Sequence, residues 1–177
     1  IDAGEVYDGA ARKLFIGFAG TGYDAFIGKL FNEHNGRRGL LKYIYLSITA
    51  YHRFTPTAMK IKINEKEIYA RPFILAVANT NQYGNGAKIA PHAVPDDGYF
   101  EVCLLQDITL LKGLMHGWRL FNGSIDRIAE TTILRARELE ITPESTIHYH
   151  LDGEPQTTSN VLRFTVLPKR IKLITSD

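Results

Sequence analysis

The chain has 177 residues, of which 45% are apolar and 23% charged. These values are ordinary for a globular domain and exclude disordered, collagen-like and repeat classes. The 21 basic and 19 acidic residues leave a net charge of +2, which provides no global attraction to nucleic acid or to an anionic bilayer. We therefore expect one domain spanning residues 1–177, no nucleic-acid partner, and peripheral membrane contact only through local patches.

The sequence contains one cysteine, Cys103, inside the apolar run 102–105. A single cysteine cannot form an intramolecular disulfide, so we expect a buried structural thiol rather than a reactive one. No apolar stretch approaches the roughly 20 residues that cross a bilayer, and the first residues lack the features of a signal peptide. These features favour a cytoplasmic protein. The chain also opens without an initiator Met, which indicates a piece of a longer polypeptide.

The N-terminal part of the chain predicts a strand followed by two helices. Residues 13–19 are apolar with weak alternation, typical of a strand, and Gly20-Thr21-Gly22 breaks that pattern. A helical pattern begins at Tyr23 and is expected to end by Asn35-Gly36. A second one covers about residues 38–52. Its apolar stripe consists of Leu40, Leu41, Ile44 and Ile48.

The middle of the chain predicts strands around one long irregular segment. Residues 58–69 alternate with period two up to Asn64 and then turn back, as in a hairpin. The run 73–78 is apolar throughout, which is typical of a central strand covered on both faces, and residues 99–105 predict another strand. Between these two runs, residues 79–99 form the longest irregular segment of the chain.

The C-terminal part predicts a third helix and a series of short strands. Asp107 can cap a helix that stops near Gly123. Its apolar face consists of Leu110, Leu111, Leu114, Trp118 and Phe121. Short runs rich in β-branched residues follow at 131–136, 138–141, 146–151, 161–166 and 170–174. The pattern predicts a mainly β domain, a sandwich or a barrel, with two or three helices.

The irregular segment contains a glycine turn, Tyr83-Gly84-Asn85-Gly86. Glycine allows positive φ and close approach to the backbone, so the exposed amides of this turn could receive an anion. An ordinary long loop is the simpler interpretation, because the Rossmann and P-loop fingerprints need a third glycine or a lysine that this turn lacks.

The same segment ends in Asp96-Asp97-Gly98, directly before an apolar strand. A hairpin turn is one interpretation, because Asp tolerates the left-handed conformation and Gly supplies positive φ. The other is a cation site, in which the Asp97 carboxylate and neighbouring carbonyl oxygens form the hard oxygen shell that Mg²⁺ prefers.

A third candidate is the run His148-Tyr149-His150-Leu151-Asp152-Gly153-Glu154. If the run stays extended, its two histidines and two acids share one face, while the apolar residues point into the core. That face could be a solvated surface ending in an Asp-Gly turn, a transition-metal site built on the His pair, or an acid/base site built on Asp152 and Glu154. Glycosidase chemistry fits worst, because residues two apart on a strand project in parallel and cannot flank a sugar bond.

In order and spacing these segments resemble the bacterial diacylglycerol kinase and sphingosine kinase superfamily. Its pattern is a strand ending in Asn, an aromatic glycine turn, Ile-Ala-Pro-x-Ala, an Asp-Gly before a strand, a later Asp-Gly-Glu, and an early Gly-x-Gly-Phe-Asp-Ala. The corresponding segments here are Asn79, Tyr83-Gly84-Asn85-Gly86, Ile89-Ala90-Pro91-His92-Ala93, Asp97-Gly98, Asp152-Gly153-Glu154 and Gly20-Thr21-Gly22-Tyr23-Asp24-Ala25.

The resemblance implies the β-sandwich, C-terminal domain of a two-domain lipid kinase, which transfers the γ-phosphoryl group of ATP to a lipid hydroxyl. Glu154 corresponds to the proton acceptor, with Asp152 beside it; Glu154 could instead contact the nucleotide or its metal. A structural Mg²⁺ site would use Asp97 and the carbonyl groups of Val94 and Tyr99. The ligand-binding turn would be Tyr83, Gly84 and Gly86.

Two departures from the family pattern matter. The middle glycine of the aromatic turn is Asn85, which tolerates the left-handed conformation better than other non-glycine residues. The phosphate-binding segment Gly-Gly-Asp-Gly-Thr, which belongs to an N-terminal nucleotide-binding α/β domain, is absent from the sequence. We therefore expect the 177 residues alone to have no kinase activity and a longer parent to have it.

Two other functions remain open at the level of sequence. The chain could be a non-catalytic β module that binds lipid or a partner, or a relative of nicotinamide-nucleotide kinases. The lipid acceptor and the oligomeric state cannot be chosen from the pattern. The lysine-rich run 60–66 is expected to be a solvated sheet face rather than a membrane contact.

Overall fold

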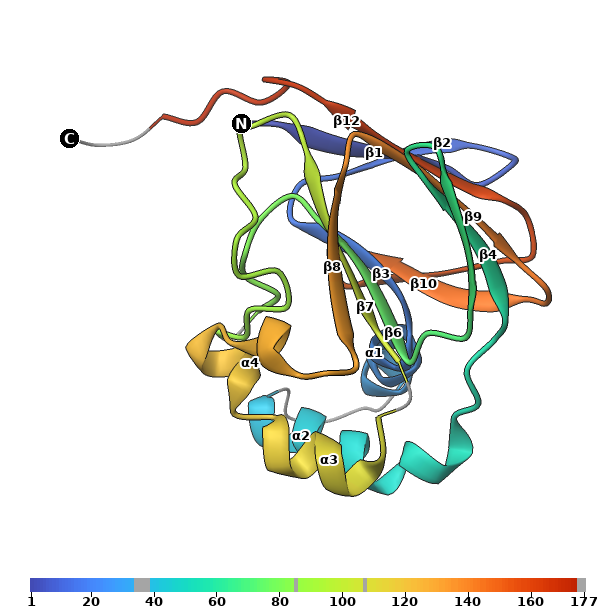
Figure 1. Ribbon diagram of the computed structural model, residues 1–177, viewed down its shortest axis with the longest axis vertical. Coiled ribbons are helices and arrows are strands. Elements are labelled where there is room, and N and C mark those ends of the chain that lie inside the picture. Colours follow the sequence, from blue (N-terminus) through green and yellow to red (C-terminus); the bar gives the residue numbers. More distant parts are fainter. Residues whose placement is uncertain (34–38, 85, 107, 175–177) are drawn as a thin grey trace.

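A computed structural model describes residues 1–33, 39–84, 86–106 and 108–174, and shows two antiparallel sheets packed face to face (Figure 1). The first sheet has the spatial order β2 (Arg12–Phe15), β1 (Ala3–Tyr7), β12 (Leu162–Leu167), β9 (Glu138–Pro143), β4 (Met59–Ile63) and β5 (Lys66–Ala70). The second has the order β11 (Glu154–Thr158), β10 (Ile147–Leu151), β3 (Phe18–Gly22), β6 (Ile74–Ala78), β7 (Phe100–Leu105) and β8 (Thr131–Ala136). The expected mainly β sandwich is confirmed.

Helices cover one end and one outer face of the sandwich. Among the described residues they are α1 (Tyr23–Glu33), α2 (Leu40–Thr49), α3 (Leu110–His116), the single turn α4 (Arg119–Asn122), and the 3₁₀ turns η1 (Tyr51–Arg53) and η2 (Ile125–Arg127). Helix α1 packs on β3 and β10, whereas α2, α3 and α4 lie at the lower end in Figure 1. None of the helices in the described ranges is long and apolar enough to cross a membrane.

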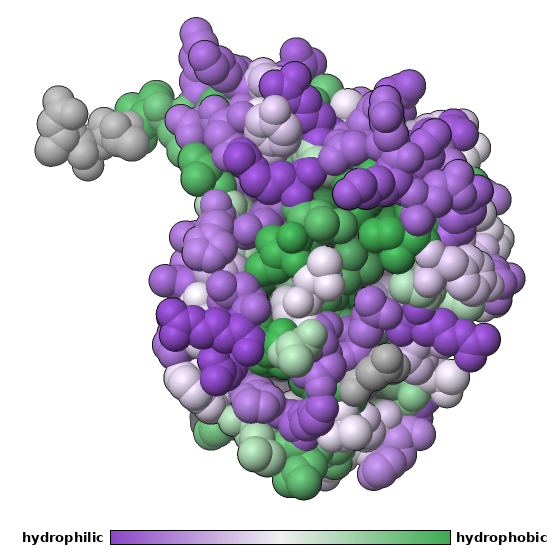
Figure 2. Space-filling model, in the orientation of Figure 1, coloured by the Kyte–Doolittle hydropathy of each residue, from purple (hydrophilic) through white to green (hydrophobic). Residues whose placement is uncertain are grey.

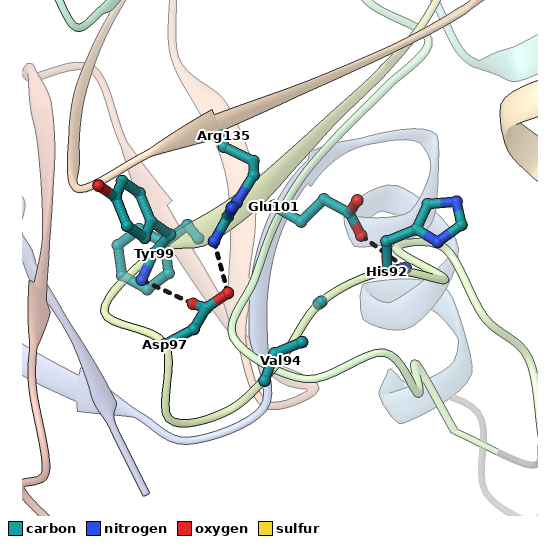
Figure 3. A pocket seen from close by; sticks show the side chains of 8 residues that line it. His92, Val94, Asp97, Tyr99, Glu101 and Arg135 are labelled. Atoms are coloured by element: carbon teal, nitrogen blue, oxygen red, sulfur yellow. Dashed lines mark hydrogen bonds and ion pairs between the residues drawn. The ribbon is translucent and has the colours of Figure 1, made fainter.

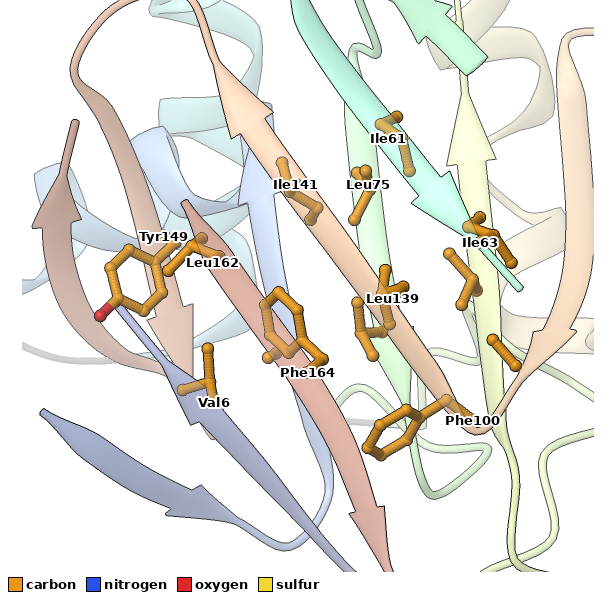
Figure 4. Packing of buried hydrophobic residues seen from close by; sticks show 14 of the residues in the cluster. Val6, Ile61, Ile63, Leu75, Phe100, Leu139, Ile141, Tyr149, Leu162 and Phe164 are labelled. Carbon is orange, nitrogen blue, oxygen red and sulfur yellow. The ribbon is translucent and has the colours of Figure 1, made fainter. Parts of the chain in front are cut away.

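The main core lies between the sheets (Figure 4). It is built from the side chains that point inward at every second residue along the strands, as the alternating buried and exposed residues of Met59–Ile63 illustrate. The rings of Phe15 and Phe100 stack at a centroid distance of 5.5 Å, and Phe164 meets Phe15 edge-on. A second apolar cluster covers the other face of β6 and β7, so these strands are buried on both sides, as the unbroken apolar run of β6 predicts.

The single strand predicted at residues 13–19 was wrong, because these residues are divided between β2 and β3. The chain turns at Ile16-Gly17, and the glycines expected to break the strand lie inside β3. A Cβ on Gly20 would lie 2.6 Å from Asp24 Oδ2, and a Cβ on Gly22 would lie 2.4 Å from the Phe73 carbonyl oxygen. These glycines therefore permit close packing against β3 rather than a turn.

The helix predictions were right in position and wrong in detail. The proposed first-helix end at Asn35-Gly36 and the Asp107 cap lie outside the described residues. Thr109 caps α3, since its hydroxyl accepts a hydrogen bond from the Lys112 amide. The expected single third helix is interrupted at Gly117-Trp118, and Gly123 ends α4 at φ 71°, as predicted.

Three strand assignments needed correction. β1 and β11 were not predicted, and residues 170–174 do not form a strand. The latter segment is held by a reciprocal pair of backbone hydrogen bonds between Ile171 and Ile1, without a longer ladder. β1 was missed because Ala3–Tyr7 contains Gly and alternates too weakly to stand out.

The thiol of Cys103 is fully buried in β7, as expected. Burial raises the pKa of the Cys103 thiol to about 12, so very little of the reactive thiolate exists near neutral pH. We expect no labelling by an aromatic disulfide reagent at pH 8 while the protein is folded, and one thiol released in denaturant. The absorbance of the released thiolate measures both. Rapid labelling of the folded protein would show that β7 opens readily.

Candidate functional site

The turn between β2 and β3 joins the Asp-Gly-Glu motif to the sheet. The two carboxylate oxygens of Asp152 accept hydrogen bonds from the backbone amides of Ile16, Gly17 and Phe18 at 2.7 to 2.9 Å. The Asp152 amide in turn donates to the Phe18 carbonyl at 2.9 Å. Asp152 and Gly153 both have positive φ, at 48° and 87°, which forms the tight two-residue turn between β10 and β11. The predicted Asp-Gly turn is confirmed.

Glu154 follows this turn at the start of the edge strand β11 and is exposed. Among the described residues, no hydrogen bond or ion pair engages its carboxylate. The two acids of the motif therefore differ: Asp152 is held by three amides, and Glu154 is available to a ligand.

The glycine turn lies against the same β2–β3 turn. The Gly17 carbonyl accepts hydrogen bonds from the amides of Asn79 and Thr80, at 2.9 and 3.1 Å, where β6 ends. The ring of Phe18 stacks on Tyr83 at a centroid distance of 4.1 Å. Phe18 thus touches both the Asp-Gly-Glu turn and the aromatic residue of the glycine turn, which brings two motifs about 70 residues apart in sequence to one place.

Gly84 and Gly86 both have positive φ, at 135° and 80°. The Tyr83 amide donates to the Ala87 carbonyl, and the Ala87 amide donates to the Gly84 carbonyl, which closes the turn tightly. A Cβ on either glycine would meet no atom within 4 Å, so the turn faces open space. That space is where a ligand can approach the backbone.

Asp2 ties the Asp97 loop to the end of β6. It is fully buried, and its carboxylate accepts hydrogen bonds from the amides of Gly98 and Lys169, each at 2.7 Å. Its backbone carbonyl accepts a hydrogen bond from the Asn79 side chain at 3.0 Å. The Asn79 side chain also donates to Ile16 at 2.8 Å. All three polar motifs are therefore linked through Asn79 and its neighbours.

The Asp97 loop lines a hollow at the start of β7 (Figure 3). Asp97 forms an ion pair with Arg135 of β8 and accepts a hydrogen bond from the Tyr99 amide at 3.0 Å. The Arg135 guanidinium also lies over the Tyr99 ring, 4.5 Å from its centroid. Glu101 lines the same hollow, and burial raises the pKa of its carboxyl group.

The residues expected to bind Mg²⁺ lie together, because Val94, Asp97 and Tyr99 all line this hollow. Their oxygen atoms are of the hard type that Mg²⁺ prefers, and the carboxylate of Glu101 adds another. The binding of a cation at Asp97 has one requirement. Arg135 already neutralises Asp97, so a cation must displace the guanidinium or share the carboxylate with it. No group of three His, Cys, Asp or Glu side chains suited to a metal occurs among the described residues.

The histidines of the run 148–154 do not lie on a solvated face. Helix α1 covers that face, and His150 Nε2 lies 2.9 Å from the buried Asp24 carboxylate. His148 lies against Lys29 of α1, and burial followed by the Lys29 charge lowers the pKa of the His148 imidazole. The expectation that Tyr149 and its apolar neighbours point into the core is confirmed.

Sequence reasoning missed three residues that build this site: Phe18, Asp2 and Arg135. Nothing in the sequence pattern indicates the partners of Phe18 and Asp2, which are 65 to 167 residues away. Arg135 lies in an ordinary strand pattern, and only the pairing of β7 with β8 places it beside Asp97.

Fold and motifs together define a domain of the diacylglycerol kinase-like lipid kinases. The chain belongs to the family described as the YegS C-terminal NAD kinase beta sandwich-like domain, whose model matches residues 17–175.

A diacylglycerol kinase of Mycobacterium tuberculosis (strain CDC 1551 / Oshkosh) is 25% identical over 156 residues, which cover 87% of this chain and 50% of that protein. A protein of Pectobacterium atrosepticum named "Probable lipid kinase YegS-like" is 34% identical over 98 residues, which cover 55% of this chain and 31% of that protein. A solved structure of a diacylglycerol kinase from Bacillus anthracis is similar to this chain with a TM-score of 0.60 at 14% identity, and the match covers 95% of this chain and 50% of that one. This likeness establishes the fold. The chain thus spans half or less of these proteins.

Proposed function

We propose that this chain is the acceptor-side domain of an ATP-dependent lipid kinase that phosphorylates a hydroxyl of a diacylglycerol-like lipid. The observation that carries the proposal is the convergence of the three polar motifs around the β2–β3 turn, with Glu154 exposed and its carboxylate available. The named lipid kinases among the relatives support the reaction class.

Glu154 is proposed as the base. Its carboxylate would orient the lipid hydroxyl and accept its proton as the oxygen attacks the transferred phosphoryl group. Asp152 would act as a positioning residue, because both of its oxygens are engaged by the amides that hold the turn. A bound Mg²⁺ at Asp97 would supply positive charge and rigidity to the loop.

The nucleotide would bind mainly to an N-terminal α/β domain, with the amides of the open turn at Gly84 and Gly86 facing its phosphates. Acyl chains would lie in an apolar part of the β domain. Figure 2 shows an apolar strip on one face, framed by polar surface. The edge strands β5 and β8 contribute the half-buried Ile68 and Leu134 to the apolar core.

The proposal is tested by assaying the longer parent with labelled ATP and a panel of lipids: diacylglycerol, sphingoid base, ceramide and phosphatidylglycerol. We expect phosphorylation of a lipid hydroxyl by the parent and none by the 177-residue chain alone. Lipid binding that is independent of nucleotide, with no phosphorylation, would instead identify a non-catalytic lipid-binding module. Phosphorylation of a nicotinamide nucleotide in place of any lipid would refute the acceptor class.

The proposed Mg²⁺ site predicts that Arg135 competes with the cation for the Asp97 carboxylate. Replacing Arg135 by Gln removes the guanidinium from Asp97, so we expect the apparent Mg²⁺ affinity to rise roughly tenfold, because a charge-assisted ion pair no longer has to be broken. The midpoint of the rise in melting temperature on titration with MgCl₂ measures this affinity.

The matched control is Asp97→Asn, which removes the anionic ligand and should abolish the Mg²⁺-dependent shift. An equal shift in wild type, R135Q and D97N would show that Mg²⁺ acts elsewhere.

A further inference from the structure

The predicted apolar stripe of α2 does not face the core. Its members Leu41, Ile44 and Ile48 are 83%, 41% and 37% exposed, and Tyr45 beside them is 65% exposed. Their spacing of i, i+3, i+4 and i+7 places them on one side of the helix. Only Leu46 of this helix is buried. An amphipathic helix has thus turned its apolar face to the outside.

The segment of α3 and α4 repeats this arrangement. Leu111, Leu114, Met115 and Trp118 have the same i, i+3, i+4, i+7 spacing and are 54% to 68% exposed, and Phe121 follows at 44%. Together with Leu40, the two segments hold ten of the sixteen large exposed apolar side chains of the described residues. Scattered exposed apolar residues are normal, but a concentration on two neighbouring helices marks an interaction site.

The two helical segments belong to one end of the molecule. The Tyr51 hydroxyl of η1, which follows α2, donates to the Ile108 carbonyl before α3 at 2.8 Å, and both residues line one hollow. Figure 1 places α2, α3 and α4 together at the lower end, and Figure 2 shows apolar side chains along that edge.

The charge of this end is of one sign. Within α2, η1, α3 and α4, the Lys, Arg and His side chains are Lys42, His52, Arg53, Lys112, His116 and Arg119, and these four elements contain no Asp or Glu. Glu130 pairs with Lys112 from outside the helices. The Arg119 guanidinium lies over the Trp118 ring, 5.0 Å from its centroid. Aromatic and basic side chains of this amphipathic kind favour the boundary between lipid and water.

Ile1 and Ile171 lie away from this end. Ile1 is hydrogen-bonded to Ile171 at the opposite end of the molecule, so additional chain joined at Ile1 would start far from the apolar helices (Figure 1). An anionic bilayer matches both the apolar side chains and the basic charge, whereas a second copy of this end would bring like charges together.

We infer that the exposed face of α2, η1, α3 and α4, here called the helical face, docks the protein on an anionic lipid surface. This inference deepens the proposed function, because it gives the route by which a membrane-embedded acceptor is reached. The residues that insert are Leu41, Tyr45, Leu111, Met115 and Trp118, and the basic side chains contact lipid phosphates.

The test uses the longer parent and flotation with vesicles of phosphatidylcholine, with or without phosphatidylglycerol. The triple variant L41Q/L111Q/M115Q changes only exposed side chains, and it should lower binding to phosphatidylglycerol vesicles at least about tenfold, because the inserted apolar area is lost. The control L14Q/L173Q changes two leucines outside the helical face, which are 59% and 61% exposed, and should bind as wild type does.

A second readout separates docking from catalysis. The triple variant should keep wild-type turnover on a short-chain diacylglycerol that is dispersed as monomers, and lose it on diacylglycerol in vesicles.

If the parent phosphorylates no lipid but the triple variant still loses vesicle binding, the proposed function fails and the docking surface stands. Unchanged vesicle binding by the triple variant overturns the inference, as does equal wild-type binding to vesicles without phosphatidylglycerol. A change of oligomeric state with vesicle binding intact would make the helical face a protein interface.

Discussion

Replacing Glu154 by Gln in the longer parent should lower the turnover number for lipid phosphorylation by about 10² to 10⁴, the usual contribution of a positioned base. The substitution keeps the size and the hydrogen-bonding geometry of the side chain but removes its ability to accept a proton. Because Glu154 is exposed and unengaged at the start of β11, the fold should be unaffected. Steady-state kinetics with saturating ATP and a dispersed lipid acceptor measure the change.

The pattern of kinetic constants separates two roles for Glu154. A base lowers the turnover number and leaves the Michaelis constant for ATP near its original value, whereas a nucleotide or metal contact raises that constant. The matched control is Glu65→Gln, at an exposed position in the β4–β5 turn, which should leave both constants unchanged. Full turnover by the Glu154→Gln enzyme would refute the assignment of this residue to the site.

Much of the fold could be predicted because its signals are local. The alternation in Met59–Ile63 indicates burial on one face, and the unbroken apolar run of β6 indicates burial on both. Gly20 and Gly22 misled the prediction because a glycine that ends a strand and a glycine that admits a close neighbour look alike in sequence. Only the positions of Asp24 and Phe73 distinguish the two cases.

The apolar stripe of α2 shows a second limit of prediction from sequence periodicity. Periodicity identifies an amphipathic helix, but it does not say what covers the apolar face. The sequence identified Leu41 and Ile44 as part of one apolar stripe, and the structure leaves both exposed. An intramolecular core and an external lipid surface produce the same pattern, so the distinction requires the packed structure.

The motifs of the candidate site could be predicted from the sequence, but the hydrogen bonds and ion pairs that join them could not. The turn residues Asp97 and Asp152 stand out by their Asp-Gly pairs, and their turn geometry was foreseeable. Their partners could not be foreseen, because Arg135 and the amides of the β2–β3 turn reach them only through strand pairing between distant segments.

Asp2→Ala should give the largest loss of stability among the changes in this network. The variant leaves the amides of Gly98 and Lys169 without the buried carboxylate that accepts their hydrogen bonds, and the loss of two charge-assisted hydrogen bonds costs on the order of 3 kcal/mol of unfolding free energy. For a domain of this size, the melting temperature should fall by about 10 °C. Hydrogen exchange should also accelerate at Gly98, since this amide is held by Asp2.

Two matched variants test whether the effect belongs to this carboxylate. Asp2→Asn keeps one acceptor oxygen and should fall between wild type and Asp2→Ala. Asp96→Ala removes an exposed carboxylate from the same loop and should leave the melting temperature nearly unchanged. If Asp2→Ala and Asp96→Ala melt alike, Asp2 does not hold the Asp97 loop. If only Asp2→Ala also weakens the Mg²⁺-dependent shift, the buried carboxylate controls the geometry of the proposed cation site.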